Sequence, residues 1–210
     1  MKIIGIAGLK GSGKDTLASY VAYQVQMHKQ YSYRPFFVAF ADALKRMLLP
    51  LGYPVKVLWG PSEAREWVHP VLGISARTLL QKVGTEVARQ VDPDFWVKAW
   101  VDVVDKLATG DYSYTPEQGI ERLLLNSPNE VFVLAADLRF DNEHKELAKR
   151  RAYTVLVERD VAQPKVDTHV SESWCREAAR RCVSTVVTNN GTLDDLKVQA
   201  AGVFGSVTGA

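Results

Sequence analysis

The sequence contains few cysteines, and their scarcity excludes several kinds of small protein. Among its 210 residues there are two, Cys175 and Cys182, which is too few for a disulfide framework or a zinc site. If both lie on one helix, their spacing places them about 10 Å apart, which is too far for a disulfide bond. We therefore expect a protein of the reducing cytoplasm.

Long apolar runs and an excess of one charge are also missing. No run approaches the roughly 20 residues that span a bilayer, so we expect no membrane partner. The apolar run IIGIAGL ends in glycines and Lys14 without a cleavage-type flank, which favours a buried strand over a signal peptide. The formal net charge of +2 is too small to indicate polymeric nucleic acid as a partner.

The remaining pattern predicts a single α/β domain with a parallel sheet. A hydrophobic fraction of 47% in a chain of this length suits one globular core. Apolar runs alternate with helical periodicity, which is typical of βαβ units with helices on both faces of the sheet. The expected strands are 2–7, 34–41, 130–137, 152–160 and 183–190, and the expected helices follow residue 13 or cover 42–49, 75–90, 92–108, 140–151, 173–182 and 192–204.

An irregular segment between the expected helices indicates how the chain is divided. Residues 50–73 hold several prolines and glycines and lack periodicity, so we expect an insertion or flap there. We place the core at 1–45 and 130–210, with a helical region at about 46–129 and a loop at about 159–175.

The stretch GLKGSGKDT, Gly8 to Thr16, predicts a phosphate-binding loop. Glycines and a lysine at the spacing G-x-x-x-x-G-K let backbone N–H groups approach phosphate oxygens, and Lys14 adds a positive charge. Asp15 stands where this motif usually carries a hydroxyl, and Thr16 follows one residue late. The hypothesis is that Gly8, Leu9, Lys10, Gly11, Ser12, Gly13, Lys14, Asp15 and Thr16 hold a nucleoside triphosphate; the alternative is a merely structural glycine turn.

A second signal stands at the end of the expected strand 130–137. Asp137 is placed like a carboxylate that holds magnesium, with Thr16 as a second metal-binding candidate. Arg139 follows at the edge where open parallel sheets bind ligands. The alternative for Asp137 is the cap of a helix.

Polar and basic residues of the middle helices predict a surface that can bind phosphate or nucleotide. Arg77, Gln81, Thr85 and Arg89 recur every fourth residue and would share one helical face with arginine forks suited to phosphate. Lys45 is a further candidate, Arg65 a less certain one, and Trp96 is either core or a platform for a base. The alternative is a solvent-exposed face.

Arg159 and Arg176 flank a proline-containing loop that could close over phosphates, or they belong to an exposed basic helix.

Taken together, these stretches resemble the phage-type deoxynucleoside monophosphate kinases. The resemblance rests on GLKGSGKDTLA, FADALKRML, LLQKVGTEVAR with DPDFWVKAW, DLRFDNE, DTHVSE and TNNGTLDDL, in this order along nearly the whole chain. It implies a P-loop NTPase three-layer sandwich with a five-stranded parallel sheet, and transfer of the γ-phosphoryl group of ATP to a dNMP with Mg²⁺.

The resemblance also implies that the helical region at about 46–129 binds the acceptor and that residues 159–175 form a lid, and it implies roles for individual residues. Lys14, Asp137 and Arg139 would be catalytic, and Asn190 would lie in the segment beside the adenine of ATP. The acceptor side would comprise Asp42, Lys45, Arg77, Gln81, Thr85, Arg89, Trp96 and Arg139, and the lid Arg159 and Arg176. A homodimer is plausible for such a kinase, and the resemblance implies a phage origin, with action in the host cytoplasm.

Two other functions stay open on the residues alone. A kinase of another small phosphorylated acceptor, such as dephospho-CoA or phosphomevalonate, would also have a phosphate-binding loop and a lid. A P-loop protein that binds nucleotide without turning it over would also carry the glycine turn.

Overall fold

The centre of the molecule is an all-parallel sheet of five strands, as the alternating pattern predicts. The computed structural model describes residues 1–28, 33–110, 131–160 and 173–209. The strands stand in the order β2-β3-β1-β4-β5. Their bounds are β1 Lys2–Gly8, β2 Arg34–Phe37, β3 Val131–Leu138, β4 Tyr153–Glu158 and β5 Thr185–Thr188. This α/β architecture is that of a P-loop kinase fold.

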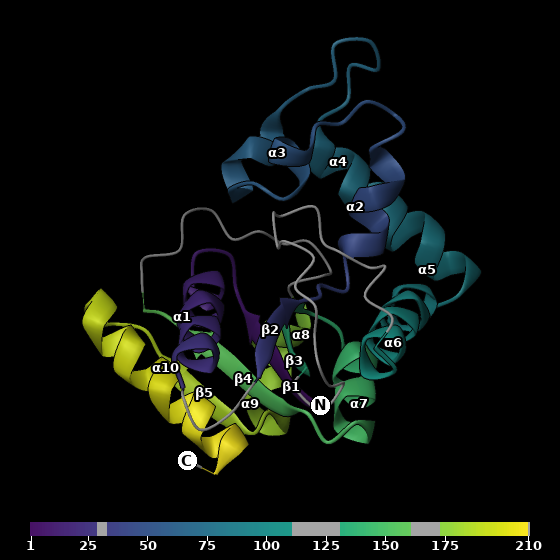
Figure 1. Cartoon of the computed structure of the whole chain (residues 1–210). Helices are drawn as coiled ribbons and strands as arrows, with labels where there is room; N and C mark the ends of the chain where they lie inside the picture. The colour runs from purple at the N-terminus through teal and green to yellow at the C-terminus, as the bar shows by residue number, and fades with distance from the viewer. Residues whose placement is uncertain (29–32, 111–130, 161–172, 210) are drawn as a thin grey trace.

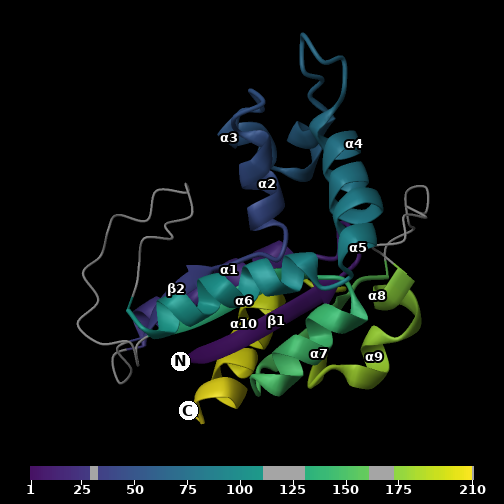
Figure 2. The same cartoon turned by 90° about the vertical axis from the view of Figure 1, so that its right-hand side faces the viewer.

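Helices cover both faces of the sheet and make three layers (Figures 1 and 2). Because successive strand residues point to opposite faces, β1 feeds two separate cores. Ile4 and Ile6 pack with the helices α1 (Lys14–Met27) and α10 (Leu193–Thr208). Ile3 belongs to the core under the other layer. That layer consists of α6 Phe95–Ala108, α7 Asp141–Lys149, α8 Ser173–Glu177 and α9 Ala179–Cys182.

A helical region rises from one edge of the sheet and has a small core of its own. It contains α2 Asp42–Leu48, α3 Val55–Leu58, η1 Ser62–Glu66, α4 Ala76–Gln81, η2 Lys82–Val87 and α5 Ala88–Val91. Leu48, Tyr53, Val57, Leu58 and Ala76 form this core. In Figure 1 this region stands above the sheet.

Several elements differ in extent from the sequence-based expectation. The strand expected over 34–41 ends at Phe37, because the chain turns to place the amides of Phe40 and Ala41 on the Asp137 carboxylate. Residues 50–73, expected as an insertion or flap, contain the short helices α3 and η1. The helix expected over 173–182 is interrupted at Ala178, between α8 and α9.

The helix expected over 75–90 is continuous but contains a wider turn. Ser75 caps it as expected, since its hydroxyl accepts a hydrogen bond from the Thr78 amide at 3.1 Å. Residues Lys82–Val87 are π-helical. A helix with i→i+5 hydrogen bonds is rare and is found most often at functional sites.

Two further sequence expectations concern absences. Among the described ranges, no helix has the length and apolarity needed to cross a bilayer. Cys175 is buried and Cys182 is exposed, and the two form no disulfide bond.

The glycine turn before α1 predicts a large stability effect. Gly13 has φ +93°, and a Cβ there would lie 2.3 Å from Asn189 Nδ2. We expect Gly13→Ala to lower the free energy of unfolding by about 2–3 kcal/mol, because both the left-handed backbone and the contact oppose a side chain. Urea denaturation measures this. The control is Gly202→Ala on α10, where nothing lies within 4 Å and a gain of roughly 0.5–1 kcal/mol is expected; equal effects at both glycines would contradict the assignment.

Candidate functional site

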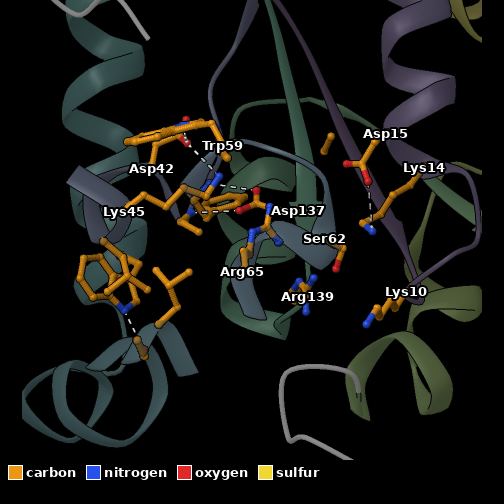
Figure 3. A pocket seen from close by; sticks show the side chains of 18 of the residues that line it. Lys10, Lys14, Asp15, Asp42, Lys45, Trp59, Ser62, Arg65, Asp137 and Arg139 are labelled. Atoms are coloured by element: carbon orange, nitrogen blue, oxygen red, sulfur yellow. Dashed lines mark hydrogen bonds and ion pairs between the residues drawn. The ribbon is translucent and has the colours of Figure 1, made fainter. Parts of the chain in front are cut away.

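A cleft of about 650 Å³ lies between the glycine turn, the end of β3 and the helical region. Figure 3 places Lys10, Lys14 and Asp15 on one side, Asp42, Lys45 and Trp59 on the other, with Arg65, Asp137 and Arg139 between them. The cleft therefore has two ends joined by a basic middle, which suits two anionic groups that meet between the ends.

The glycine turn has the geometry of an anion-binding loop. Gly11 and Gly13 adopt positive φ of +81° and +93°, and Gly13 is the N-cap of α1. The Ser12 carbonyl accepts a hydrogen bond from Asn189 Nδ2 at 2.8 Å, which fixes the loop against the loop after β5. Ser12 Oγ is buried and has no hydrogen-bond partner within the described part of the chain. Together with the N-terminus of α1, these groups can bind phosphate.

Lys14 begins α1 with its side chain 9% exposed, and its Nζ lies 3.6 Å from Asp15 Oδ2. The Asp15 side chain is 82% exposed. Of the nine residues expected to hold a triphosphate, Lys10, Gly11, Lys14 and Asp15 line the cleft, whereas Gly8, Leu9, Ser12, Gly13 and Thr16 do not. Asp15, at the position of the usual hydroxyl, therefore lines the cleft. Thr16, the residue expected to contact a metal ion, follows Asp15 in α1 and is not part of the lining.

Asp137 anchors the start of the helical region. Its Oδ1 accepts the Phe40 amide and its Oδ2 the Ala41 amide, both at 2.9 Å. It thus caps α2, which is distant in sequence, instead of the helix that follows it. Burial raises the pKa of Asp137, and Lys45 opposes this shift. The metal-binding role stays a prediction, and no group of three or more His, Cys, Asp or Glu suited to a metal occurs among the described residues.

Asp42 organises the far end of the cleft. Its Oδ1 accepts Trp59 Nε1 at 2.9 Å and Lys45 Nζ at 3.4 Å, and its Oδ2 accepts the Ala39 amide at 2.8 Å. Lys45 Nζ also lies 5.5 Å from the centre of the Trp59 ring. Asp42 is buried, so its role is to hold Lys45 and Trp59 at the wall of the cleft.

The helical face expected on the acceptor side does line the cleft, through Arg77, Gln81, Thr85 and Arg89. In an α-helix, residues four apart drift by about 40° per step, which would turn Arg89 about 120° from Arg77. A π-helical turn holds more than four residues, whereas an α-helical turn holds about 3.6. A step of four residues therefore overshoots a full turn in an α-helix and falls short of one in a π-helix, so the two rotations partly cancel. The π-helical segment η2 therefore keeps the four side chains on one side.

Trp96 is a core residue at the wall of the cleft. It is 3% exposed, and its Nε1 donates to the Gly84 carbonyl at 2.7 Å. Its contact with η2 supports the wider helical turn.

Arg65 is the residue that the sequence indicated least clearly. It lies on η1 in the segment 50–73, is half-buried, and lines the cleft. Burial, then the charges of Arg139 and Arg77, lower its pKa, while Asp15 and Asp137 oppose the shift. Arg65 Nε is buried without a hydrogen-bond partner in the part of the chain that the structure describes. The positive charges of Arg139 and Arg77 thus act against that of Arg65, and guanidiniums gathered in a cleft are suited to an anion.

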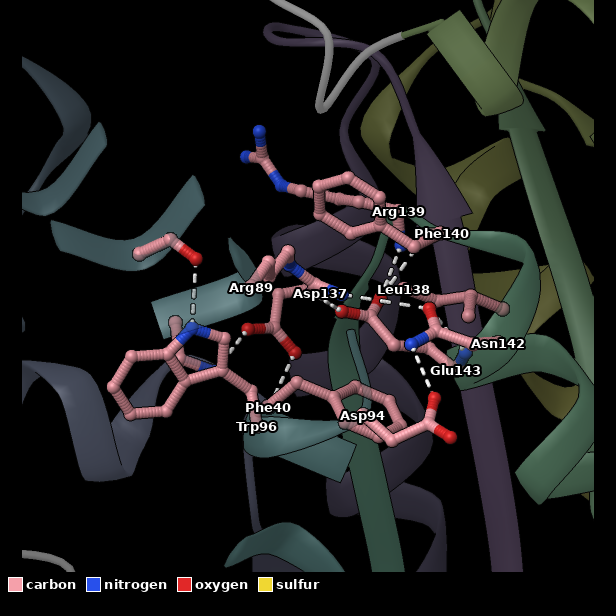
Figure 4. A network of polar contacts seen from close by, with 12 residues as sticks. Phe40, Arg89, Asp94, Trp96, Asp137, Leu138, Arg139, Phe140, Asn142 and Glu143 are labelled. Atoms are coloured by element: carbon pink, nitrogen blue, oxygen red, sulfur yellow. Dashed lines mark hydrogen bonds and ion pairs between the residues drawn. The ribbon is translucent and has the colours of Figure 1, made fainter. Parts of the chain in front are cut away.

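Arg89 and Glu143 form a buried ion pair in the wall of the cleft (Figure 4). Arg89 Nη2 donates to Glu143 Oε1 at 2.7 Å, and Glu143 Oε2 accepts the amides of Arg139 and Phe140 at 2.8 and 3.1 Å. Sequence reasoning missed Glu143; the available signal was a glutamate at the third position of a helix, which is typical of a capping box.

Three expected site residues lie away from the cleft or beside undescribed chain. Asn190 does not line the cleft. Its Oδ1 accepts a hydrogen bond from the Asp160 backbone amide at 2.7 Å, and its Nδ2 donates to Asp160 Oδ2 at 2.6 Å. Arg159 and Arg176 are exposed. Most of the expected lid falls in 161–172, outside the described residues, so its closure stays a prediction.

Comparison with known proteins gives one informative relative. The chain is 27% identical to a protein of Acanthamoeba polyphaga mimivirus named "Putative deoxynucleotide monophosphate kinase", over an alignment that covers 95% of this chain and 94% of the relative. This similarity agrees with the resemblance found in the sequence motifs. No family model matches the chain.

The buried Glu143 predicts a pH dependence of stability. Burial, and then the charge of Asp137, raise the pKa of Glu143 from 4.5 to about 7. Between these values the folded protein binds the proton and the unfolded chain does not, so this contribution to stability is complete below pH 4.5 and is lost as pH rises through 7. We expect the stability of the wild type relative to Glu143→Gln to fall by roughly 3 kcal/mol across this range. Urea denaturation of both proteins at pH 4.5 and 8 measures the difference, and parallel pH profiles would contradict it.

Proposed function

We propose that the protein transfers the γ-phosphoryl group of ATP to the phosphate of a deoxynucleoside monophosphate. The observation that carries the proposal is the arrangement of the cleft, with a phosphate-binding turn at one end, an aromatic and polar wall at the other, and Arg65, Arg77 and Arg139 between them. The similarity to the viral relative supports the same reaction.

The donor end fits the phosphates of ATP. The amides of the glycine turn, the N-terminus of α1 and the Lys14 ammonium supply positive charge. Lys14 is nearly buried, so its charge acts in a poorly solvated place, where electrostatic stabilisation is strongest. Lys10 lies at the mouth of the same end (Figure 3).

The residues at the cleft also fit a magnesium ion bound with ATP. Asp15 and Asp137 line the cleft and carry the hard oxygen atoms that Mg²⁺ prefers. Both Asp137 oxygens already accept backbone amides, so Asp137 would hold the ion through a bound water. Since protein sites for Mg²⁺ with nucleotides use one or two carboxylates plus phosphate and water, two carboxylates suffice. Mg²⁺ supplies charge neutralisation when bound, and Asp15 and Asp137 would hold it.

The acceptor end fits a short anionic nucleotide. Arg77 presents a guanidinium whose Nη2 is fixed by the Ser62 carbonyl at 2.7 Å. Trp59 and Lys45, held by Asp42, form the wall farther from the glycine turn. Gln81 and Thr85 provide neutral polar groups for a base or sugar. The reaction then needs positioning and charge stabilisation by Arg65 and Arg139, with little proton chemistry.

The test is an acceptor panel with coupled detection of ADP. We expect ADP formation with ATP and one or more dNMPs, and no turnover with dephospho-CoA or phosphomevalonate. Phosphorylation of either of these acceptors would replace the proposal with a different small-molecule kinase. ATP binding without ADP from any acceptor would identify a nucleotide-binding protein instead.

A further inference from the structure

One carboxylate joins the helical region to the end of β3. Glu143, in the first turn of α7, is 2% exposed. Its Oε2 accepts the amides of Arg139 and Phe140, while Oε1 accepts Arg89 Nη2. The Glu143 side chain thus links the chain segment that carries the cleft residue Arg139 to α5, the last helix of the helical region.

Both terminal nitrogens of the Arg89 guanidinium donate to the protein. Besides the bond to Glu143, its Nη1 donates to the Pro93 carbonyl at 3.1 Å. Its guanidinium lies over the Phe140 ring, 3.7 Å from the ring centre, and its side chain is 13% exposed. Asn142 Nδ2 donates to the same Pro93 carbonyl at 2.9 Å and to Asp94 Oδ1 at 2.8 Å, and Figure 4 shows the contact with Asp94. An arginine held in this way is poorly available to a substrate.

The helical region is therefore fixed at both of its ends to one short stretch of chain. At the start of α2, the Asp137 carboxylate binds the amides of Phe40 and Ala41. At α5, the Arg89–Glu143 pair binds the turn that begins two residues after Asp137. Arg65 and Arg77 lie between these two anchors in the chain, so the anchors set their distance from the glycine turn.

We propose that Arg89 and Glu143 are positioning residues, which hold the acceptor side against residues 137–140 and thereby align the acceptor with the donor phosphates. The inference rests on the proposed function and assigns Arg89 a different role from direct contact with the acceptor. A misplacement of about 1 Å between reacting groups costs on the order of 100-fold in rate, so a pair that touches no substrate controls turnover.

The kinetic test uses Glu143→Gln, Arg89→Met and the double variant. Each single variant is expected to lower kcat by about 10- to 100-fold with the KM for ATP within about twofold, and the double variant is expected to be no slower than the slower single one. If Arg89 instead contacts the acceptor, Arg89→Met raises the KM for the dNMP and Glu143→Gln does not. Multiplied losses in the double variant, or wild-type kcat in folded Glu143→Gln, would overturn the proposal.

A matched control and a second measurement separate positioning from simple stability. Glu146→Gln removes a carboxylate on the same helix that pairs with Arg150 Nε at 3.0 Å, and it is expected to keep wild-type kcat. Hydrogen exchange, followed without substrates, is expected to accelerate at residues 76–91 in both single variants, with the amides of β1 and α1 unchanged. Unchanged exchange at 76–91 contradicts the proposal. If the wild type phosphorylates no acceptor, the proposed function fails, while exchange still decides the role of the pair.

Discussion

Replacing Lys14 with alanine is expected to lower kcat by about 100- to 1,000-fold, because the variant lacks a preorganised cation beside the transferred phosphoryl group. The Lys14 side chain is only 9% exposed and its ion-pair partner, Asp15, is largely in solvent. Alanine suits the first turn of a helix, so the fold should persist. ADP formation under saturating ATP and dNMP measures kcat, and circular dichroism and thermal unfolding check the fold.

Lys149→Ala is the matched control for this experiment. Lys149 ends α7, its side chain is 74% exposed, and its Nζ contacts Glu146 at 3.2 Å. A surface pair of this kind contributes little, so kcat and stability should stay near the wild-type values. If Lys14→Ala is folded and turns over like Lys149→Ala, the glycine turn takes no part in the reaction.

Replacing Arg65 with methionine is expected to lower activity without lowering stability. Methionine keeps most of the apolar stem but removes a guanidinium that repels Arg77 and Arg139 and has a buried Nε without a partner in the described chain. The melting temperature of the free protein should therefore be unchanged or higher. The value of kcat/KM for the dNMP should fall by about 100-fold or more, since the charge that opposes the phosphates is lost.

The comparison for Arg65 is Arg180→Met, at an exposed arginine on α9 that pairs with Glu158. This variant should retain both activity and melting temperature. A loss of stability in Arg65→Met, or normal kcat/KM in the folded variant, would place Arg65 among ordinary structural residues and remove it from the anion site.

Much of the core and the donor end could be predicted from the sequence because their signals are local. The apolar run before Gly8 predicts β1, and the glycine and lysine spacing predicts the left-handed turn at Gly11 and Gly13. Asp137 and Arg139 were predicted at the end of a strand, and both line the cleft. Strand ends were less accurate, as β2 shows, because a contact with Asp137, almost 100 residues away, ends the strand.

The less regular segments were predicted poorly for the same reason. Residues 50–73 lack periodicity, so the sequence offered Arg65 only as a less certain candidate and did not predict the helix η1 that turns it into the cleft. The four-residue spacing from Arg77 to Arg89 suggested a shared face, but an α-helix would have lost it through drift. The π-helical turn at Lys82–Val87 preserves it, and Trp96 contacts that turn from another helix.

The sequence alone determined the parallel α/β core and the glycine turn before α1, since periodicity and glycine spacing act over a few residues. Only the tertiary structure decided how charged side chains are paired. Arg89 and Glu143 are 54 positions apart, and Asp137 binds amides 96 and 97 positions away. Because no local pattern records which buried charges meet, folding decides which arginines face the cleft and which are held by the protein.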